Sequence, residues 1–224
     1  MTSESLNRID RGTLHDRVYQ EIRRALMSGD FAPGKTLTLK ALAQEVGTSI
    51  MPARDALRRL ATEHALDLLP NRSIVVPVLT PERLNEIRDI RLALESMAAA
   101  LAAGRMSDRD LADLAEICEA MHGQRGSPPN DYLAQNHEFH FRIYRAASRP
   151  ILVAMIETLW LQIGPPLNVA ICRDAQRLDP QHYHAVLAAL RARNGKAAGR
   201  AVAAIVLAVS DLLTGGLRGN LPST

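Results

Sequence analysis

The chain has 224 residues, enough for two domains of ordinary size or for one large domain. Its residues are 47% hydrophobic, 23% charged and only 4% aromatic, a globular balance that favours packed helices over a β-sandwich. The formal net charge of +3 is too small to identify an anionic partner, so the arrangement of the charges must do so.

Cysteine content and hydropathy exclude several classes of protein. Cys118 and Cys172 are the only cysteines, too few for a disulfide scaffold or a cysteine-rich zinc site, and both are expected to be buried. The polar start of the chain, 1–10, does not resemble a signal peptide. The longest uninterrupted apolar stretch, 201–209, falls short of the roughly 18 residues needed to span a bilayer. We therefore expect a cytoplasmic protein without a membrane partner.

The chain opens with two predicted helices. A capping-box-like start and apolar residues at every fourth position predict an amphipathic helix over residues 13–28, which Gly29 ends. After a turn rich in proline and glycine, a second helix is expected over residues 39–46, with Gly47 as its C-cap.

A third helix and a hairpin follow. The helix is expected from about Ser49 to Glu63, with Pro52 in its first turn, where the missing N–H costs nothing. Two short apolar segments, 65–69 and 74–79, are separated by turn-forming residues and predict a β-hairpin. Three helices followed by a hairpin are the order of a winged helix-turn-helix.

The third helix carries the charge pattern of a DNA-reading element. Its inner stripe is apolar, and Arg54, Arg58 and Arg59 lie outside that stripe. Arginine suits this role because its planar fork can bridge guanine edges or hold a phosphate. A basic amphipathic helix alone is more often a solvated face, so the interpretation depends equally on the helix-turn-helix spacing and on the arginine at the hairpin tip.

Everything after residue 79 is predicted to be helical. Thr80 and Pro81 supply an N-cap and a first-turn proline, and breaks then recur along the rest of the chain. The predicted fold is therefore mainly α: a winged helix-turn-helix over residues 1–79, then an all-α antiparallel bundle of six or seven helices over residues 80–224. The breaks expected between its helices are Gly123–Asn130, Arg149–Pro150, Pro165–Pro166, Asp179–Pro180 and Asn194–Gly195.

Short motifs run through the first domain at fixed spacing. They are Leu42-Ala43, Gly47, Ser49-Ile50-Met51-Pro52, Ala53-Arg54-Asp55-Ala56-Leu57 and Pro70-Asn71-Arg72-Ser73. In these motifs residues 13–79 resemble the N-terminal domain of GntR-family regulators. The resemblance implies a DNA-binding transcription factor.

The third helix departs from the family pattern at two positions. Ile50 and Met51 stand where the family commonly has arginine and threonine, and they could touch thymine methyl groups instead. We therefore expect an operator unlike the common family consensus. The predicted DNA contacts are Lys40, Ser49, Ile50, Met51, Pro52, Arg54, Arg58, Asn71 and Arg72.

The second half is similar to the FCD domain of the FadR-like branch of that family. The motifs that carry this resemblance are Arg91-Leu92-Ala93-Leu94-Glu95, Asn136-x-x-Phe139-His140 and Ala189-Leu190-Arg191. The resemblance implies a domain that binds a small-molecule effector and pairs into a homodimer, matching a palindromic operator.

Many FCD domains hold a divalent metal, such as zinc or nickel, through an aspartate or asparagine and three histidines. Here Asn136 and His140 keep two of these positions, whereas the alignment puts Tyr183 and Ile205 at the others. Isoleucine cannot bind a metal and tyrosine binds poorly unless ionised, so a metal is not expected unless His182 or His184 takes part. The predicted effector-binding residues are Arg91, Asn136, His140, Arg173, Tyr183 and Ile205.

The sequence thus predicts a transcriptional regulator, most simply a repressor, whose operator affinity is controlled by an effector such as an organic acid. Two alternatives stay open: an all-helical metal-dependent enzyme and an interaction module without an effector. No phosphate loop, nucleophile elbow or His-Glu-x-x-His motif supports an enzyme. A helical domain without a cavity would favour the interaction module.

Overall fold

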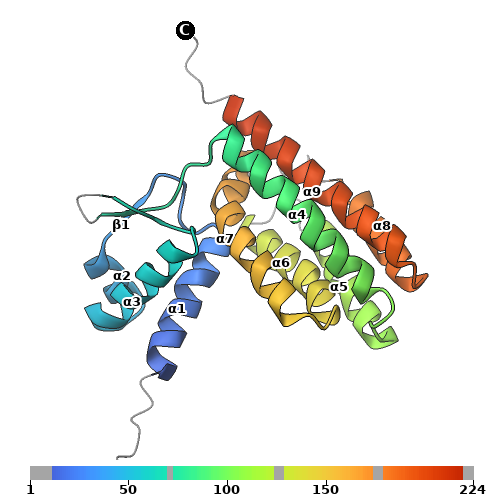
Figure 1. Ribbon diagram of the computed structural model, residues 1–224, viewed down its shortest axis with the longest axis horizontal. Coiled ribbons are helices and arrows are strands. Elements are labelled where there is room, and N and C mark those ends of the chain that lie inside the picture. The colour runs from blue at the N-terminus through green and yellow to red at the C-terminus, as the bar shows by residue number, and fades with distance from the viewer. Residues whose placement is uncertain (1–11, 70–72, 124–128, 174–178, 219–224) are drawn as a thin grey trace, which may run out of the picture.

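The computed structural model describes residues 12–69, 73–123, 129–173 and 179–218, which form a small N-terminal head beside a helical bundle (Figure 1). The predicted fold class, mainly α with a small sheet, is confirmed. The elements of the head are α1 (Gly12–Met27), β1 (Thr36–Leu37), α2 (Leu39–Glu45), α3 (Ile50–Thr62), β2 (Asp67–Leu68) and β3 (Ile74–Val75). The bundle contains α4 (Pro81–Ala102), α5 (Asp108–Gly123), α6 (Pro129–Ala146), α7 (Pro150–Arg173), α8 (Gln181–Arg191) and α9 (Gly195–Arg218).

The head has a three-stranded antiparallel sheet in the order β1-β3-β2, one strand more than the predicted hairpin. β1 pairs Thr36 with Val75, and β2 pairs Asp67 with the same residue. A strand of two residues is too short to show an alternating pattern, which is why the sequence did not predict β1. The strand predicted over 74–79 ends at Val75, since Pro77 has no N–H to continue the ladder.

The core of the head forms where α1 crosses α3. Of the apolar residues repeated along α1, Val18, Ile22 and Leu26 are buried, as are those on the inner face of α3, whereas Leu14 is 50% exposed. His15 Nδ1 lies 3.1 Å from an Asp55 carboxylate oxygen and joins the outer ends of the two helices. The residues that α1 and α3 contribute to this core are Val18, Tyr19, Ile22, Leu26, Ala56, Leu57 and Leu60.

In the bundle, α4 and α9 pack closely along their lengths, side by side (Figure 1). Glycine on α9 permits this approach, because a Cβ at Gly199 would lie 2.9 Å from the carbonyl oxygen of Ser96. A second core fills the space that the helices enclose, with Phe139, Phe141 and Tyr144 of α6 among its largest fully buried side chains.

The predicted break at Pro165–Pro166 is wrong, because α7 continues through both prolines to Arg173. A proline inside a helix removes a hydrogen bond but can keep helical φ. Here Pro165 is buried next to Gly164, which packs on the end of α1, so tertiary contacts offset the lost hydrogen bond. The described part of the bundle therefore has six helices, the lower of the two expected numbers.

Two further expectations need correction. Cys118 is buried as expected, but Cys172 is exposed near the end of α7, where its Sγ lies 3.1 Å from Asn168 Oδ1. Two apolar stretches, Pro150–Cys172 and Gly195–Gly215, are long enough to cross a bilayer by length and hydropathy, contrary to the expectation from uninterrupted runs. In each stretch, half of an 18-residue apolar window is buried inside the protein.

Candidate DNA-reading surface and effector cavity

The turn into α3 gives the helix a defined start. Gly47 has φ of +65°, a conformation that glycine adopts at no steric cost. Ser49 then takes an extended backbone as N-cap, and α3 begins at Ile50. The inner face of the helix is buried, so its outer face is presented to solvent along its length.

Two arginines on that outer face have no ion-pair partner among the described residues. Arg54 and Arg58 are exposed, and no carboxylate in the described part of the chain lies within ion-pair distance of either. Arg59 differs, because its guanidinium lies 3.7 Å over the ring of Tyr19 and its Nε lies 3.4 Å from Glu63. The free cations on α3 are therefore Arg54 and Arg58, while Arg59 stabilises the contact with α1.

The first turn of α3 adds an apolar element to this surface. Ile50 and Met51 are 45% and 57% exposed, so two large apolar side chains in succession face solvent at the start of the helix. Lys40 and Ser49 are also exposed, whereas Pro52 is buried on the inner face and does not reach the surface predicted for it. Asn71 and Arg72, the predicted wing contacts, lie outside the described residues.

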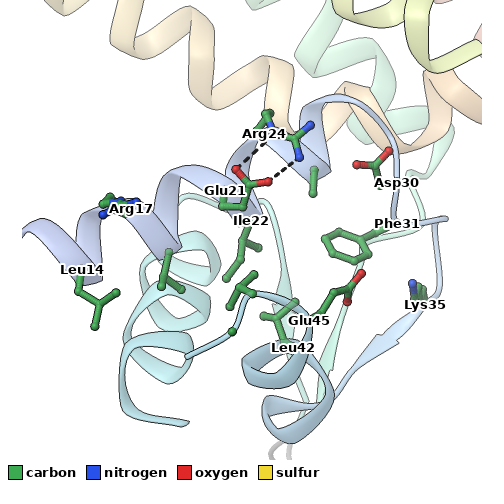
Figure 2. A pocket seen from close by; sticks show the side chains of 14 residues that line it. Leu14, Arg17, Glu21, Ile22, Arg24, Asp30, Phe31, Lys35, Leu42 and Glu45 are labelled. Carbon is green, nitrogen blue, oxygen red and sulfur yellow. Dashed lines mark hydrogen bonds and ion pairs between the residues drawn. The ribbon is translucent and has the colours of Figure 1, made fainter. Parts of the chain in front are cut away.

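A surface groove of about 630 Å³ lies between α1 and α2 of the head (Figure 2). Arg24 crosses its wall and donates to Glu21 over 2.5 Å, and Lys35 lies 4.8 Å from the centre of the Phe31 ring. None of the residues predicted to bind the effector lines this groove. It is a feature of the head surface, distinct from the effector site expected in the bundle.

Four of the six residues predicted to bind the effector line a cavity where α4, α6, α7 and α9 surround the end of α1. The open space is about 10 Å³, roughly the size of one water-sized sphere. Its wall is apolar except for Arg91, Asn136, His140 and the indole of Trp160. The lining residues are Met27, Arg91, Leu133, Asn136, His140, Trp160, Ile163, Gly164, Leu167, Ile205 and Val209.

A buried ion pair stands behind one side of this wall. Arg91 Nε donates to Glu95 Oε1 over 2.6 Å, one helical turn along α4. Trp160 Nε1 donates to the same oxygen over 2.9 Å, and the Tyr144 hydroxyl donates to the other carboxylate oxygen over 2.6 Å. Arg91 is 4% exposed and Glu95 is fully buried, so the two charges neutralise each other inside the bundle.

Asn136 and His140 lie one turn apart on α6, and each is held by a tyrosine. The Tyr183 hydroxyl donates to Asn136 Oδ1 over 2.9 Å, and His140 Nδ1 lies 2.9 Å from the Tyr144 hydroxyl. Burial, followed by the nearby Arg91 charge, lowers the pKa of His140 to about 3. The imidazole is therefore neutral at physiological pH.

Most of the predicted effector residues come together. Arg91, Asn136, His140 and Ile205 line the cavity, and Tyr183 lies one hydrogen bond behind Asn136. Arg173 ends α7, and its side chain lies outside the described part of the structure.

Among the residues of the site that were not predicted from the sequence, Met27, Glu95 and Trp160 contribute most to its chemistry and to its link with the head. The spacing of Glu95, four residues after Arg91 on one helix, was a detectable sign of an ion pair. No sequence pattern places Met27 or Trp160 at the cavity, because tertiary packing brings them there.

The donor set of the cavity does not suit a divalent metal. Asn136 Oδ1 already accepts a hydrogen bond from Tyr183, and burial raises the pKa of that phenol well above its ordinary value, so it stays protonated. Ile205 offers no donor atom. The described residues contain no group of three or more His, Cys, Asp or Glu side chains placed to hold a metal ion.

The head and the bundle meet where the end of α1 packs against α7. Gly164 permits the contact, since a Cβ there would lie 2.6 Å from the carbonyl oxygen of Leu26. Asn168 Nδ2 donates to the carbonyl oxygens of Ser28 and Gly29, over 3.0 and 2.9 Å. Because Met27 lies inside this seam and also lines the cavity, the head forms part of the cavity wall.

Two polar contacts reinforce the seam. Arg23 Nη2 lies 2.7 Å from Glu157 Oε2 and links α1 to α7. Arg83 Nη2 of α4 donates to Gln162 Oε1 over 2.9 Å and to the carbonyl oxygen of His64 over 3.0 Å. The orientation of the head therefore depends on side chains from both α4 and α7.

Comparison with known families and proteins supports the same division of roles. Residues 14–76 match the model described as bacterial regulatory proteins of the gntR family, and residues 86–208 match the FCD domain. The chain is 37% identical over 182 residues to the HTH-type transcriptional regulator McbR of Escherichia coli, covering 80% of this chain and 82% of McbR. It is 29% identical over 153 residues to the gluconate operon transcriptional repressor of Bacillus subtilis, covering 68% and 61% of the two chains.

The fold has close counterparts among solved structures. The E. coli McbR/YncC structure superposes with a TM-score of 0.84 and 33% identity, covering 91% of this chain and 98% of that one. A putative GntR regulator from Rhodococcus sp. RHA1 superposes with a TM-score of 0.69 at 20% identity over the same shares, which supports the fold alone.

Proposed function

The chain belongs to the GntR family of bacterial regulatory proteins, in the group that carries an FCD domain, and from this premise we propose that α3 reads operator DNA under the control of an effector in the bundle cavity. Like these relatives, it is a transcriptional regulator and not an enzyme. Because the related gluconate operon regulator is named a repressor, we assign repression to this protein too, in the cytoplasm where its DNA lies.

One observation carries the DNA-binding assignment: Arg54 and Arg58 are exposed on the outer face of α3, and neither forms an ion pair within the part of the chain that the structure describes. They lie one helical turn apart, so both can enter the same major groove. Ile50 and Met51 precede them and present apolar surface that suits thymine methyl groups. The solvent-facing side of α3 therefore carries both positive charge and exposed apolar area, and a DNA duplex offers contacts for both.

Substitution of Arg54 tests this assignment. Arg54→Ala is expected to weaken binding to a duplex selected from a random pool by about 5- to 150-fold, the cost of one bidentate contact to a base. Fluorescence anisotropy measures the affinity, and circular dichroism checks that the fold is intact. The matched control is Arg200→Ala, an exposed arginine on α9 of the bundle. Full operator affinity in Arg54→Ala would refute the assignment.

We propose that the effector acts through the seam between α1 and α7. A ligand can change DNA affinity only if it favours one arrangement of the head over another. Met27 is the last residue of α1 and lines the cavity, so a molecule entering a space of about 10 Å³ must displace it or a neighbour. The movement would pass into α1, which packs on α3.

The seam can be disturbed without a ligand. Gly164→Ala places a Cβ 2.6 Å from the carbonyl oxygen of Leu26, so the end of α1 must shift. Operator affinity is then expected to change by roughly fivefold or more, a typical coupling between distant sites. Gly104→Ala is the matched control, because a Cβ at that position meets nothing within 4 Å. An unchanged operator affinity in Gly164→Ala would refute coupling through this seam.

We further propose that the protein works as a homodimer paired through α4 and α7. These neighbouring helices expose Ile90, Met97, Ile151 and Met155, which are 40%, 51%, 79% and 52% exposed. An isologous interface needs such a self-complementary apolar face. Sedimentation equilibrium of the double variant Met97→Glu/Met155→Glu is expected to give a monomer, and a dimer that survives would place the interface elsewhere.

We also infer that the protein acts without a bound metal, since Tyr183 and Ile205 stand at two ligand positions of metal-binding FCD domains. Elemental analysis of protein purified without chelators is expected to find no stoichiometric divalent ion. One ion per chain would overturn this inference.

We also propose a domain boundary at about residue 79. Two separate hydrophobic cores support it, although Leu161 of α7 contributes to the core of the head.

A further inference from the structure

The hydrogen-bond network around the cavity fixes which atoms it can offer to a ligand. The Tyr144 hydroxyl has one proton and donates it to Glu95 Oε2 over 2.6 Å. The contact of 2.9 Å between that hydroxyl and His140 must therefore use a proton on Nδ1. In a neutral imidazole the opposite nitrogen, Nε2, then carries no proton and can only accept.

Asn136 is oriented by the same logic. Its Oδ1 accepts the proton of the Tyr183 hydroxyl over 2.9 Å, and the Tyr132 hydroxyl lies 2.9 Å from Tyr183 on the other side. The amide oxygen is thus turned toward the tyrosines, which leaves the amide NH₂ as a donor. No hydrogen bond from a described residue reaches this NH₂ or His140 Nε2.

The cavity also has no net charge to offer. The Arg91 guanidinium is neutralised by Glu95, whose two carboxylate oxygens receive protons from Arg91, Trp160 and Tyr144. Burial keeps His140 neutral by lowering its pKa to about 3. Burying an anion without a compensating cation costs far more than burying a neutral polar group that finds its hydrogen bonds.

We propose that the effector is a small uncharged molecule in which an N–H or O–H donor stands beside a carbonyl, so that the carbonyl accepts from Asn136 and the donor gives its proton to His140 Nε2. Amides, lactams and hydroxy-carbonyl compounds have this edge. An organic acid has it only in its protonated form, because a carboxylate has no proton to give and adds an unpaired charge. The proposal rests on the proposed function, whose effector it specifies.

Three nearly isosteric probes test whether the ligand needs a donor beside its carbonyl: butanamide, butanoate and pentan-2-one. The chain has a single tryptophan, and Trp160 lines the cavity, so its fluorescence reports occupancy directly. Butanamide is expected to bind full-length protein at least about tenfold more tightly than butanoate. Pentan-2-one lacks the donor, and its affinity should be lower by roughly fivefold or more, the cost of leaving a buried acceptor without a partner.

Three variants keep the test decisive. Met27→Ala removes the thioether from the wall and makes room for the probes, so a tight wild-type cavity cannot hide a preference. Glu95→Gln leaves Arg91 uncompensated and is expected to shift the preference toward butanoate; thermal shift checks that this variant is folded. Asn136→Asp replaces the amide donor with an acceptor and should lose butanamide binding, which separates this edge from general apolar packing.

The proposal is overturned if butanoate binds as tightly as butanamide, or if none of the probes binds Met27→Ala at the limit of solubility. Operator affinity is measured on the same preparations. A protein that binds its operator but prefers the carboxylate is still a regulator with a different effector class, whereas a protein without operator affinity contradicts the proposed function itself.

Discussion

Arginine is used in opposite ways in the head and in the bundle. On α3, Arg54 and Arg58 are exposed and unpaired. On α4, Arg91 is 4% exposed and bonded to a carboxylate that is itself fully buried. An exposed cation keeps its hydration and is free to meet a phosphate or a guanine, whereas a buried one must be neutralised where it stands. Arginines in DNA contact should therefore be the unpaired ones, and a paired arginine near a cavity is a poor anchor for an anion.

Removing the charge of Glu95 tests whether the buried Arg91 needs its counter-charge. Glu95→Gln leaves the Arg91 guanidinium without its counter-charge in the interior, which is expected to lower the free energy of unfolding by about 3–5 kcal/mol. Chemical denaturation measures the change. The double variant Arg91→Met/Glu95→Gln removes the uncompensated charge and keeps an amide oxygen as an acceptor near Trp160 and Tyr144, so it should recover much of the loss. If Glu95→Gln were as stable as the wild type, the pair would not be buried as described.

The buried neutral histidine gives the bundle a pH dependence. The unfolded chain protonates His140 below a pKa near 6.5, whereas the folded protein resists protonation until about pH 3. As the pH is lowered through this window, the free energy of unfolding therefore decreases. This residue accounts for a loss of about 2 kcal/mol between pH 7 and pH 5. His137, whose pKa burial lowers to about 4, acts in the same direction. Urea denaturation at several pH values should show that the free energy of unfolding depends less on pH in His140→Gln than in the wild type. An equal dependence would contradict the burial of His140.

For the exposed arginines, the salt dependence of DNA binding shows which part of the duplex each one contacts. If Arg58 meets the DNA backbone, Arg58→Ala is expected to weaken binding to all sequences and to lower the salt slope by about one. If Arg58 reads a base instead, the slope stays and discrimination at one operator position falls by about 1–3 kcal/mol. Operator titrations at several salt concentrations separate the two roles, and a variant unchanged in both respects would remove Arg58 from the reading surface.

The smallest effect is expected at the seam, where the pair is only partly buried. Arg23 and Glu157 are 12% and 25% exposed and lie 2.7 Å apart. Glu157→Gln should cost about 1 kcal/mol or less in the free energy of unfolding, because solvent still reaches both side chains and screens the pair. A loss as large as that of Glu95→Gln would mean that exposure does not separate the two kinds of pair.

Local signals in the sequence were sufficient for most of the elements. Capping residues, the glycine turn at Gly47 and the apolar stripe of α3 act within a few residues of one another, so the start of that helix was predicted closely. β1 was missed because two residues show no period, and α7 was cut at Pro165 because the local cost of a proline was visible while the packing that offsets it was not. Pro52 was expected at the DNA surface, yet the twist of the helix turns it inward.

By itself the sequence determined the family, the order of the elements and the chemistry of the residues on α3 and α6, since these depend on residue type and short spacing. Only the tertiary structure decided which charges are compensated, that Arg54 and Arg58 are free while Arg59 and Arg91 are held, and that Met27 of the head forms part of the wall of a cavity in the bundle. The physical reason is that burial and pairing join residues far apart in the chain, which no local pattern of side chains encodes.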